Sequence, residues 1–257
     1  AMPFATILTL NTFGLLGDSF GWRVPVLFTS LYSLLVLLLF LFRYPSLPGE
    51  IEKNEGKSLD FREILSSIKG SGLSIWLIAI MWMLYNASSI SYLTFGGDYY
   101  ISVGYDESYA GFLTSLLMIG ALLLSSVVGY LTDKFGKAEY FIIGGSISLA
   151  IALLLVPRTE ISPLLIGALI GISASCIPAP VFALVPKVLP PEQMGLGYGI
   201  LTSCLNLGVF VGPLLVGLLY DRSLNYISGF NLMGGLSMAT AIVGFILKGI
   251  NQTELGK

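Results

Sequence analysis

Long apolar runs separated by short polar or charged segments dominate the chain. This pattern predicts the tail of a helix over residues 1–17 and full helices over residues 24–43, 73–96, 108–132, 138–157, 162–186, 194–220 and 226–248. Each full run is long enough to cross the hydrocarbon core of a bilayer, which takes roughly 20 apolar residues. We therefore expect an all-α polytopic membrane bundle with seven full transmembrane helices and one partial N-terminal helix.

Residues 44–72 form a long polar stretch between two apolar runs. Within it, "SLDFREILSSIK" places Phe61, Ile64, Leu65 and Ile68 at helical spacing behind Ser58, a residue type that caps helices. The pattern favours a linker followed by a short amphipathic helix on the membrane surface, and a solvated loop is the alternative. The expected domains are residues 1–43, a central loop over 44–72, a six-helix unit over 73–250 and a tail over 251–257.

Composition narrows the class of protein further. Hydrophobic residues make up 55% of the chain and charged residues 11%, where a soluble domain usually carries about 25% charge. The net charge of −2 leaves no basic face for nucleic acid, and the absence of histidine removes histidine-based metal sites and proton relays. Cys176 and Cys204 lie inside apolar runs and are expected to pack rather than to pair. We expect no metal, no cofactor and no enzyme activity.

The distribution of basic residues predicts the orientation of the helices. If residues 44–72 are cytoplasmic, alternation of the spans places ten bases on that side and three on the other. The cytoplasmic bases are then Arg43, Lys53, Lys57, Arg62, Lys69, Lys134, Lys137, Lys187, Lys248 and Lys257, and the opposite ones are Arg23, Arg158 and Arg222. The C-terminus is expected on the cytoplasmic side as well.

A short motif recurs at three helix ends, with one acid four residues after a glycine. The copies are Gly14 with Asp18, Gly129 with Asp133, and Gly217 with Asp221. They are three spans apart and so fall on alternate sides of the membrane. An odd-numbered unit inverts each time it repeats, which is typical of secondary transporters.

The second copy, "GYLTDKFGK", resembles the loop signature of the major facilitator superfamily, G-x-x-x-D-(R/K)-x-G-(R/K). Gly129, Asp133, Lys134, Gly136 and Lys137 match that signature, and Ala138 stands where a further base is common. The stretches "GWRVP", "ALVPKVLPPEQMGLGYGI" and "NLGVFVGPLLVGLLYD" are similar to later parts of the family and occur in the family's order. The resemblance covers nearly the whole chain.

The resemblance implies a protein of two six-helix halves that rock about a central cavity. The chain would run from the end of the fifth helix to the twelfth, so we expect a fragment whose first helices, with the N-terminal half as partner, are missing. The signature loop would act as a conformational latch, with Asp133 facing the positive end of a neighbouring helix. A plain tight turn is the alternative interpretation of that loop.

Polar residues inside the spans are candidates for lining the cavity. Trp82, Tyr85, Ser89 and Tyr92 form one helical stripe, with Asn86 beside it. The other candidates are Ser175, Ser203 and Asn206. For each of them, a hydrogen bond between helices is an equal alternative to contact with a solute. No charged residue lies at the middle of a predicted span, so this half is not expected to carry a proton-coupling carboxylate or an anion-binding arginine.

Small residues and prolines mark expected packing and bending points. Gly208 and Gly212 form a GxxxG spacing, followed by Pro213 and Gly217, and Pro178 and Pro180 are expected to bend the span before it. "GVFVGPLLVG" resembles a motif that the family's antiporters carry on the fifth helix. Here it lies on the eleventh, so it indicates packing rather than antiport. Asp98 is expected in a solvated loop, and Asp106 with Glu107 at the start of a helix.

These observations favour secondary active transport of a small, neutral or weakly polar solute by alternating access, in the plasma membrane. A non-transporting membrane receptor or assembly partner with the same fold is the alternative. An integral membrane enzyme would need clustered acids, histidines or a metal site, and the sequence offers none.

Overall fold

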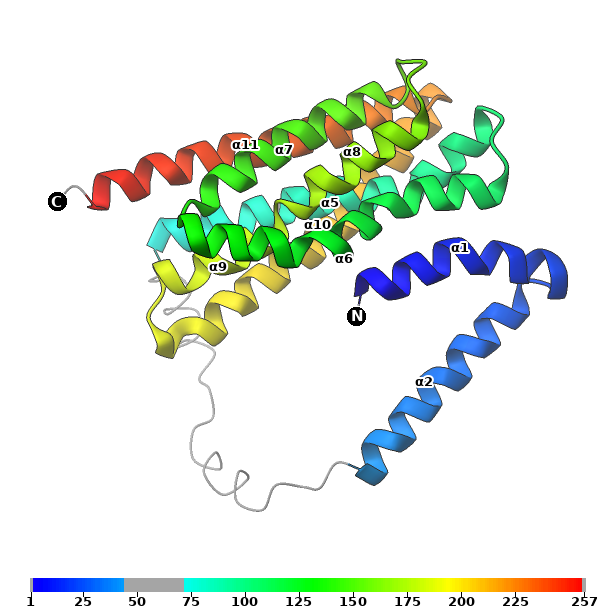
Figure 1. The fold of residues 1–257 in the computed structure, drawn as a ribbon, viewed down its shortest axis with the longest axis horizontal. Coiled ribbons are helices and arrows are strands. Elements are labelled where there is room, and N and C mark those ends of the chain that lie inside the picture. Colours follow the sequence, from blue (N-terminus) through cyan, green and yellow to red (C-terminus); the bar gives the residue numbers. More distant parts are fainter. Residues whose placement is uncertain (1, 44–71, 256–257) are drawn as a thin grey trace. The chain divides into compact units, whose positions relative to one another are not determined.

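A computed structural model describes residues 2–43 and 72–255, and this part of the chain is helical (Figure 1). The long helices are α1 (Met2–Phe20), α2 (Arg23–Arg43), α5 (Gly72–Ser102), α6 (Glu107–Phe135), α7 (Ala138–Leu155), α8 (Pro163–Ser175), α9 (Pro178–Val188), α10 (Met194–Ser223) and α11 (Ile227–Leu255). A 3-10 turn, η1 (Pro191–Gln193), precedes α10. The amphipathic helix expected around Phe61 lies outside the described residues.

Seven helical spans in the described part are long and apolar enough to cross a membrane. They are α2, α5, α6, α7, the combined α8 and α9, α10 with η1, and α11 as far as Ile250. The prediction of an all-α membrane bundle with seven full spans is therefore confirmed.

Two predicted helix ends are wrong. The last span, expected to stop at residue 248, continues as α11 to Leu255. The span expected to stop at residue 96 continues as α5 to Ser102, so Asp98 lies in an exposed turn of a helix rather than in a loop. Gly96 and Gly97 weaken a helix locally, but Gly96 lies in the helix interior, where a Cβ would come within 3.2 Å of the Tyr92 ring. Tertiary packing of the following tyrosines outweighs the local weakness of two glycines.

The chain divides into two compact units, Ala1–Asn11 with Gly72–Lys257, and Thr12–Ser71. In the second unit the described residues form the end of α1 and all of α2. Side chains of leucine and phenylalanine on α2 are largely exposed, as expected of a helix that faces lipid. The domain limits expected from the sequence stay predictions.

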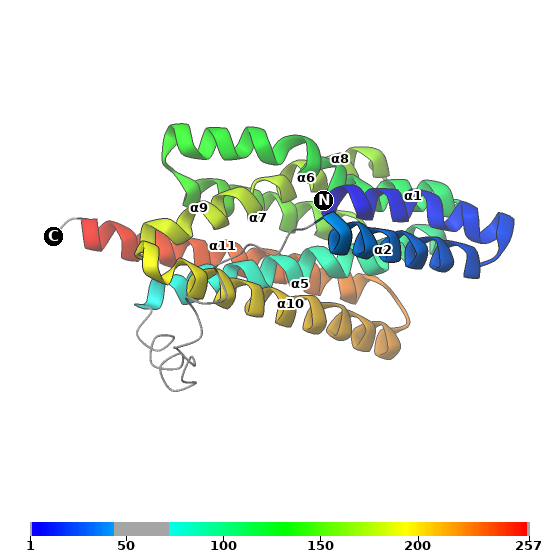
Figure 2. The same cartoon turned by 90° about the horizontal axis from the view of Figure 1, so that it is seen from below.

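In the first unit, α5, α6, α7, the combined α8 and α9, α10 and α11 form what we call the six-helix part. Helix α5 is at its centre. It packs on α10, α11 and α6, while α11 also packs on α7, and α8 packs on both α6 and α7 (Figures 1 and 2). Ile75, Ile78, Met81 and Tyr92 of α5 are completely enclosed by these neighbours. Half-burial of the surrounding helices fits a bundle whose outer surface meets lipid or another part of the protein.

Glycines let several of these helices approach to backbone contact. A Cβ built on Gly208 would lie 2.3 Å from the carbonyl oxygen of Met83, and one on Gly212 would lie 2.4 Å from that of Ala87. Gly120 of α6 meets Gly171 of α8 in the same way, because a Cβ added to Gly120 would lie 2.3 Å from the backbone of Gly171. Close packing of small residues takes the place of the hydrophobic effect between membrane helices.

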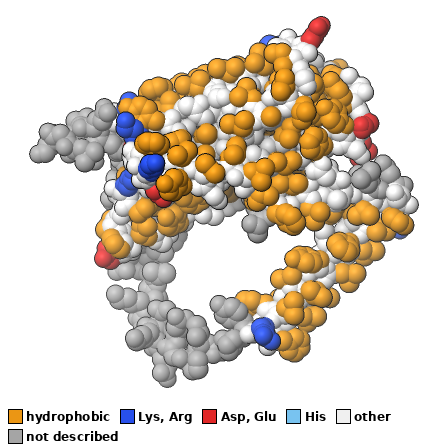
Figure 3. Space-filling model, in the orientation of Figure 1, with side chains coloured by type: hydrophobic (Ala, Val, Ile, Leu, Met, Phe, Trp, Pro, Cys, Tyr) orange, Lys and Arg blue, Asp and Glu red, His pale blue; other side chains and the backbone are white. Residues whose placement is uncertain are grey.

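Charged side chains are found toward the ends of the six-helix part. In Figure 3, hydrophobic side chains cover most of the body of the bundle. The end formed by the α6–α7 turn carries Lys134, Lys137, Lys187 and Lys248, whereas the opposite end carries Glu160 and Arg158. This separation agrees with a membrane-spanning body between two wet ends.

Candidate functional site

The span made by α8 and α9 is interrupted in its middle. Cys176 and Ile177 separate the two helices, and Pro178 begins the second. Because proline has no N–H, the carbonyl of Ala174 lacks its usual helical donor four residues later. The hydroxyl of Tyr85 donates to that oxygen at 3.3 Å, from the neighbouring helix α5. The N–H of Ile177 also donates to this oxygen, at 3.4 Å, so Tyr85 is an additional donor that connects α5 to the break in the neighbouring span.

The expected polar stripe of α5 is buried inside the unit. Trp82, Tyr85, Asn86, Ser89 and Tyr92 are each at most 7% exposed. The amide of Asn86 donates to the carbonyl of Trp82 at 2.7 Å, within its own helix. The hydroxyl of Tyr92 lies 3.5 Å from that of Tyr100. The structure therefore places this stripe between packed helices, and its contact with a solute stays a prediction.

Ser175 is likewise buried, near the end of α8. Its hydroxyl donates to the carbonyl of Ile172 at 2.7 Å, also within its own helix. It therefore lies beside the same helix break as Tyr85, but its hydrogen bond does not connect two helices.

The candidates on α10 have the opposite environment. Ser203 and Asn206 are exposed near the middle of this helix. The amide of Asn206 donates to the carbonyl of Thr202 at 2.9 Å. The hydroxyl of Thr202 donates to the backbone carbonyl of Tyr198 at 2.8 Å. These side chains form a polar row that no helix of the first unit covers.

Aromatic rings connect this row to the buried stripe. Trp82 stacks on Tyr85 with 5.5 Å between ring centroids and meets Phe182 of α9 edge-on at 5.2 Å. Phe182 stacks on Tyr198 at 6.0 Å and is itself exposed. We call Phe182, Tyr198, Thr202, Ser203 and Asn206 the α9–α10 face. It brings the exposed hydroxyl and amide groups near mid-span together with two rings that lie closer to the lysine-rich end.

Sequence reasoning missed three members of the α9–α10 face, namely Phe182, Tyr198 and Thr202. Tyr198, Thr202 and Asn206 follow one another at four-residue intervals, so helical spacing could have identified two of them. Phe182 carries no such signal, because its position depends on the direction of α9 after the break at Pro178.

The expected packing and bending positions are now placed. Pro180 lies in the first turn of α9, and α10 runs without interruption through Gly212 and Pro213. Gly217 makes an ordinary contact, with its Cβ position 3.6 Å from the Phe95 ring.

The signature loop joins α6 and α7 at the lysine-rich end. Gly136 ends α6 with a φ of +64°, and its N–H donates to the carbonyl of Thr132, a conformation that glycine adopts without strain. Gly129 faces Ala179 of α9, with 3.6 Å between its Cβ position and that of the alanine. Asp133 is exposed near the end of α6.

The lysines of this loop lie over aromatic rings. Lys134 is 6.0 Å from the ring centroid of Tyr130, and Lys137 is 5.7 Å from that of Tyr140, which Lys248 of α11 approaches to 4.3 Å. Such contacts hold ammonium groups at the edge of the bundle. They leave the carboxylate of Asp133 facing outward.

The opposite end of the unit carries a group of tyrosines. Asp106 caps α6 there by accepting a hydrogen bond from the N–H of Tyr109 at 3.2 Å, which confirms the expected cap. Burial, with the neighbouring Tyr220 hydroxyl and the Asp98 charge, raises the pKa of Tyr226 to about 12, so this phenol stays protonated at neutral pH. Among residues 2–43 and 72–255 no cluster of acids and cysteines suited to a metal ion occurs.

Comparison with known proteins identifies relatives of the chain. A family model described as Major Facilitator Superfamily matches residues 96–256. A lysosomal dipeptide transporter of Danio rerio is 26% identical over 194 residues, which cover 75% of this chain and 42% of that protein. The human protein of the same name is 24% identical over 172 residues, covering 66% of this chain and 37% of its own length.

A third relative comes from an organism other than an animal. An uncharacterized MFS-type transporter of Methanocaldococcus jannaschii is 25% identical over 214 residues, which cover 81% of this chain and 54% of that protein. The chain therefore spans about half the length, or less, of the curated relatives it matches.

Proposed function

Because the chain belongs to the Major Facilitator Superfamily, a family of membrane transporters and not of enzymes, we propose that it supplies the C-terminal half of a secondary active transporter. The transporter moves a small solute across a membrane by alternating access. The N-terminal half of the same protein completes the cavity. The greater length of the relatives supports this division of the molecule.

The α9–α10 face is the observation that carries the proposal. Asn206 and Thr202 are polar and exposed near the middle of a membrane span. Transfer of an amide to hydrocarbon is costly, and the bond from Asn206 to the carbonyl of Thr202 uses one of the two donors of that amide. A water-filled cavity between two halves removes that cost. Exposed mid-span amides are therefore expected on a cavity wall and not on a lipid-facing surface.

The solute is a small molecule with no net charge. In the described spans of the six-helix part, no lysine, arginine, aspartate or glutamate lies near mid-span, so this half offers no counter-charge for an ion. The α9–α10 face provides hydroxyl, amide and aromatic groups instead. A zwitterion with balanced charges fits such a wall, and dipeptides, which the animal relatives are named for, are the first class to test.

Asp133 and the signature loop act as the latch of the cytoplasmic side. The acid is exposed at the end of α6, where a helix of the N-terminal half reaches it in one state of the cycle. A carboxylate gains there from the positive end of a helix and from a charge-assisted hydrogen bond. In a plain tight turn, the competing interpretation, Gly136 gives backbone freedom and the charge of Asp133 serves only to meet water.

Uptake of radiolabelled dipeptides into proteoliposomes tests the function and the latch together. We expect uptake by the original protein, and a loss of about tenfold for Asp133→Asn, because removing one charge-assisted contact of roughly 1.4 kcal/mol unbalances the two states. Glu192→Gln is the matched control, since Glu192 is an exposed acid at the same end of the bundle.

The outcomes separate the interpretations. Normal uptake by well-expressed Asp133→Asn protein would leave the loop as a plain turn. Saturable binding of dipeptides without uptake would favour a receptor or assembly partner. If the intact protein neither binds dipeptides nor takes them up, dipeptides are excluded as the solute.

The chain is an integral membrane protein. We propose the plasma membrane as its compartment. Within the membrane, we place the α6–α7 turn and the C-terminus on the cytoplasmic side, because lysines gather at that end. The animal relatives are named as lysosomal, so microscopy of a tagged protein, together with protease access to the C-terminus, decides the compartment and the orientation.

A further inference from the structure

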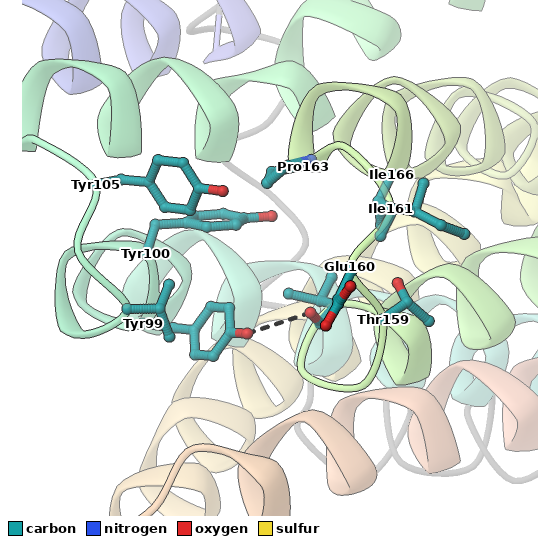
Figure 4. Close-up of a pocket in the computed structure, with 10 residues that line it drawn as sticks. Tyr99, Tyr100, Tyr105, Thr159, Glu160, Ile161, Pro163 and Ile166 are labelled. Atoms are coloured by element: carbon teal, nitrogen blue, oxygen red, sulfur yellow. Dashed lines mark hydrogen bonds between the residues drawn. The ribbon is translucent and has the colours of Figure 1, made fainter.

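A cavity of about 200 Å³ opens at the end of the six-helix part that lies opposite the signature loop (Figure 4). It is formed by the last turn of α5, the segment between α5 and α6, and the segment between α7 and α8. The residues that line it are Tyr99, Tyr100, Val103, Tyr105, Val156, Thr159, Glu160, Ile161, Pro163 and Ile166. Several of them lie between spans, so the cavity is at the wet end of the bundle.

Three tyrosine rings form one side of this cavity. Tyr100 meets Tyr99 at 60° with 5.4 Å between centroids, and meets Tyr105 at 78° with 6.1 Å. Figure 4 shows the rings of Tyr100 and Tyr105 together on one wall, across from Pro163, with Tyr99 and Glu160 below them. Rings set at steep angles to one another present faces and edges toward a shared space, as in cages for organic cations.

The tyrosines are held in place by the fold. Tyr99 donates to the carbonyl of Val156 at 3.2 Å, drawn as the dashed line in Figure 4, and this bond connects α5 to the end of α7. Tyr100 is only 2% exposed, with its hydroxyl 3.5 Å from that of Tyr92. Tyrosines of a membrane-interface belt lie along the outer surface and face the head groups. A ring buried behind a cavity does not serve that purpose.

Glu160 supplies a negative charge to the cavity. Of the ten lining residues, all within the described part, it is the charged one. The adjacent base, Arg158, donates instead to the carbonyl of Leu154 and to the side chain of Asn231 on α11. Its guanidinium is therefore engaged outside the cavity.

The electrostatic surroundings also favour a cation. At this end of the six-helix part, acids outnumber bases, with Asp98, Asp106, Glu107, Glu160 and Asp221 against Arg158 and Arg222. An excess of one sign raises the local concentration of the opposite ion. The volume is below the roughly 300–1,000 Å³ of sites for drug-sized ligands, so the cavity takes a single small head group.

We propose that this cavity binds a small organic ammonium group, held over the half-exposed ring of Tyr105, behind which Tyr100 is buried, and paired with the carboxylate of Glu160. The site lies wholly within the six-helix part and is separate from the α9–α10 face. Its occupancy does not depend on whether the protein transports a dipeptide or any other solute.

Choline is a suitable probe, and 3,3-dimethylbutan-1-ol is its neutral counterpart, with carbon in place of nitrogen. Binding is measured by saturation-transfer NMR on the methyl protons, at constant ionic strength. The protein is held in a maltoside detergent, which itself has no ammonium group. We expect choline to bind at least about tenfold more tightly than the alcohol, because only the cation gains from the rings and the acid.

Four variants assign the binding to the cavity. Glu160→Gln keeps the shape and removes the charge, and is expected to weaken choline binding by about fivefold. Tyr105→Leu removes a π face and is expected to weaken it by about threefold to tenfold, whereas Tyr105→Phe keeps the face and stays within about twofold. Glu107→Gln, an exposed acid at the same end but outside the cavity, measures the general effect of charge at this end and is expected to keep binding within about twofold.

The proposal is overturned by any of three results. The first is no choline binding by the intact protein, and the second is equal binding of choline and the alcohol. The third is unchanged binding in both Glu160→Gln and Tyr105→Leu. The Phe variant guards against misfolding, since a loss of binding in both Tyr105 variants points to the hydroxyl or the fold rather than to the ring face.

Discussion

The hydrogen bond from Tyr85 to the carbonyl of Ala174 shows how single residues stabilise an interrupted membrane helix. The distance is 3.3 Å, and the oxygen, which has no donor at Pro178, also accepts a long hydrogen bond of 3.4 Å from the N–H of Ile177. In hydrocarbon a carbonyl without a donor is costly, so helix breaks persist where neighbours supply donors. Tyr85 therefore belongs to the structure of the α8–α9 break as much as to any cavity.

Replacing Tyr85 by phenylalanine removes the donor and keeps the ring. We expect a loss of about 1 kcal/mol in the free energy of unfolding, which corresponds to a fall of about 2–4 °C in melting temperature for a unit of this size. Circular dichroism of the protein in detergent measures the change. Tyr130→Phe is the control, because Tyr130 is exposed on α6. Equal melting of both variants would mean that the backbone bond from Ile177 is sufficient for the carbonyl of Ala174.

At the scale of helices, the contact between α5 and α10 depends on the absence of side chains. Gly208 and Gly212 lie one helical turn apart and place α10 directly against the carbonyls of Met83 and Ala87. Main-chain atoms cannot move aside as a flexible side chain can. Added methyl groups therefore force the two helices apart rather than cause a local adjustment.

The double variant Gly208→Ala, Gly212→Ala tests this contact. Overpacking costs about 1–3 kcal/mol at such sites, so we expect the melting temperature to fall by several degrees. Gly199→Ala on the same helix is the matched control, since nothing lies within 4 Å of its Cβ position. That change is expected to be neutral or to stabilise by up to about 1 kcal/mol, because alanine is the better helix former. Similar melting of the double variant and the control would show that α5 and α10 pack loosely.

The elements also show what the sequence could and could not predict. The spans follow from apolar runs of about 20 residues, and the helix break follows from Pro178, since both signals are local. The continuation of α5 through Gly97 is not local, because it depends on the packing of Tyr99 against Val156, Tyr226 and Phe230, far along the chain.

The candidate site divides in the same way. Helical spacing identified a polar row on α5 and part of another on α10. Helical spacing alone does not show which of the two rows packs against other helices of the six-helix part and which lies on its outer surface. That depends on the central position of α5, which buries Asn86, and on the outer position of α10, which exposes Asn206. The cavity at the opposite end combines Tyr99, Tyr100 and Tyr105, which are neighbours in the sequence, with Glu160, which no local signal connects to them.

At the scale of the whole molecule, exposed surface near mid-span has two possible neighbours, lipid or the water of a cavity. Asn206 on α10 and Ile242 on α11 are both exposed near the middle of a span. Their side chains suggest different neighbours, because an amide prefers water and isoleucine prefers hydrocarbon. If the bundle is half of a transporter, the two surfaces differ in their access to water.

Cysteine labelling decides between these neighbours. In a protein with Cys176→Ala and Cys204→Ala, we expect Asn206→Cys to react with a water-soluble, membrane-impermeant thiol reagent at least about tenfold faster than Ile242→Cys. The reason is that the reagent attacks the thiolate, which forms in water and not in hydrocarbon. Labelling after denaturation, where both cysteines are free, corrects for the amount of protein.

Equal protection of both positions in the membrane would place α10 against lipid or packed protein, and the α9–α10 face would then not line a cavity. Fast labelling of Asn206→Cys that a solute slows would assign the solute to this face, since occupancy of the cavity excludes the reagent from it.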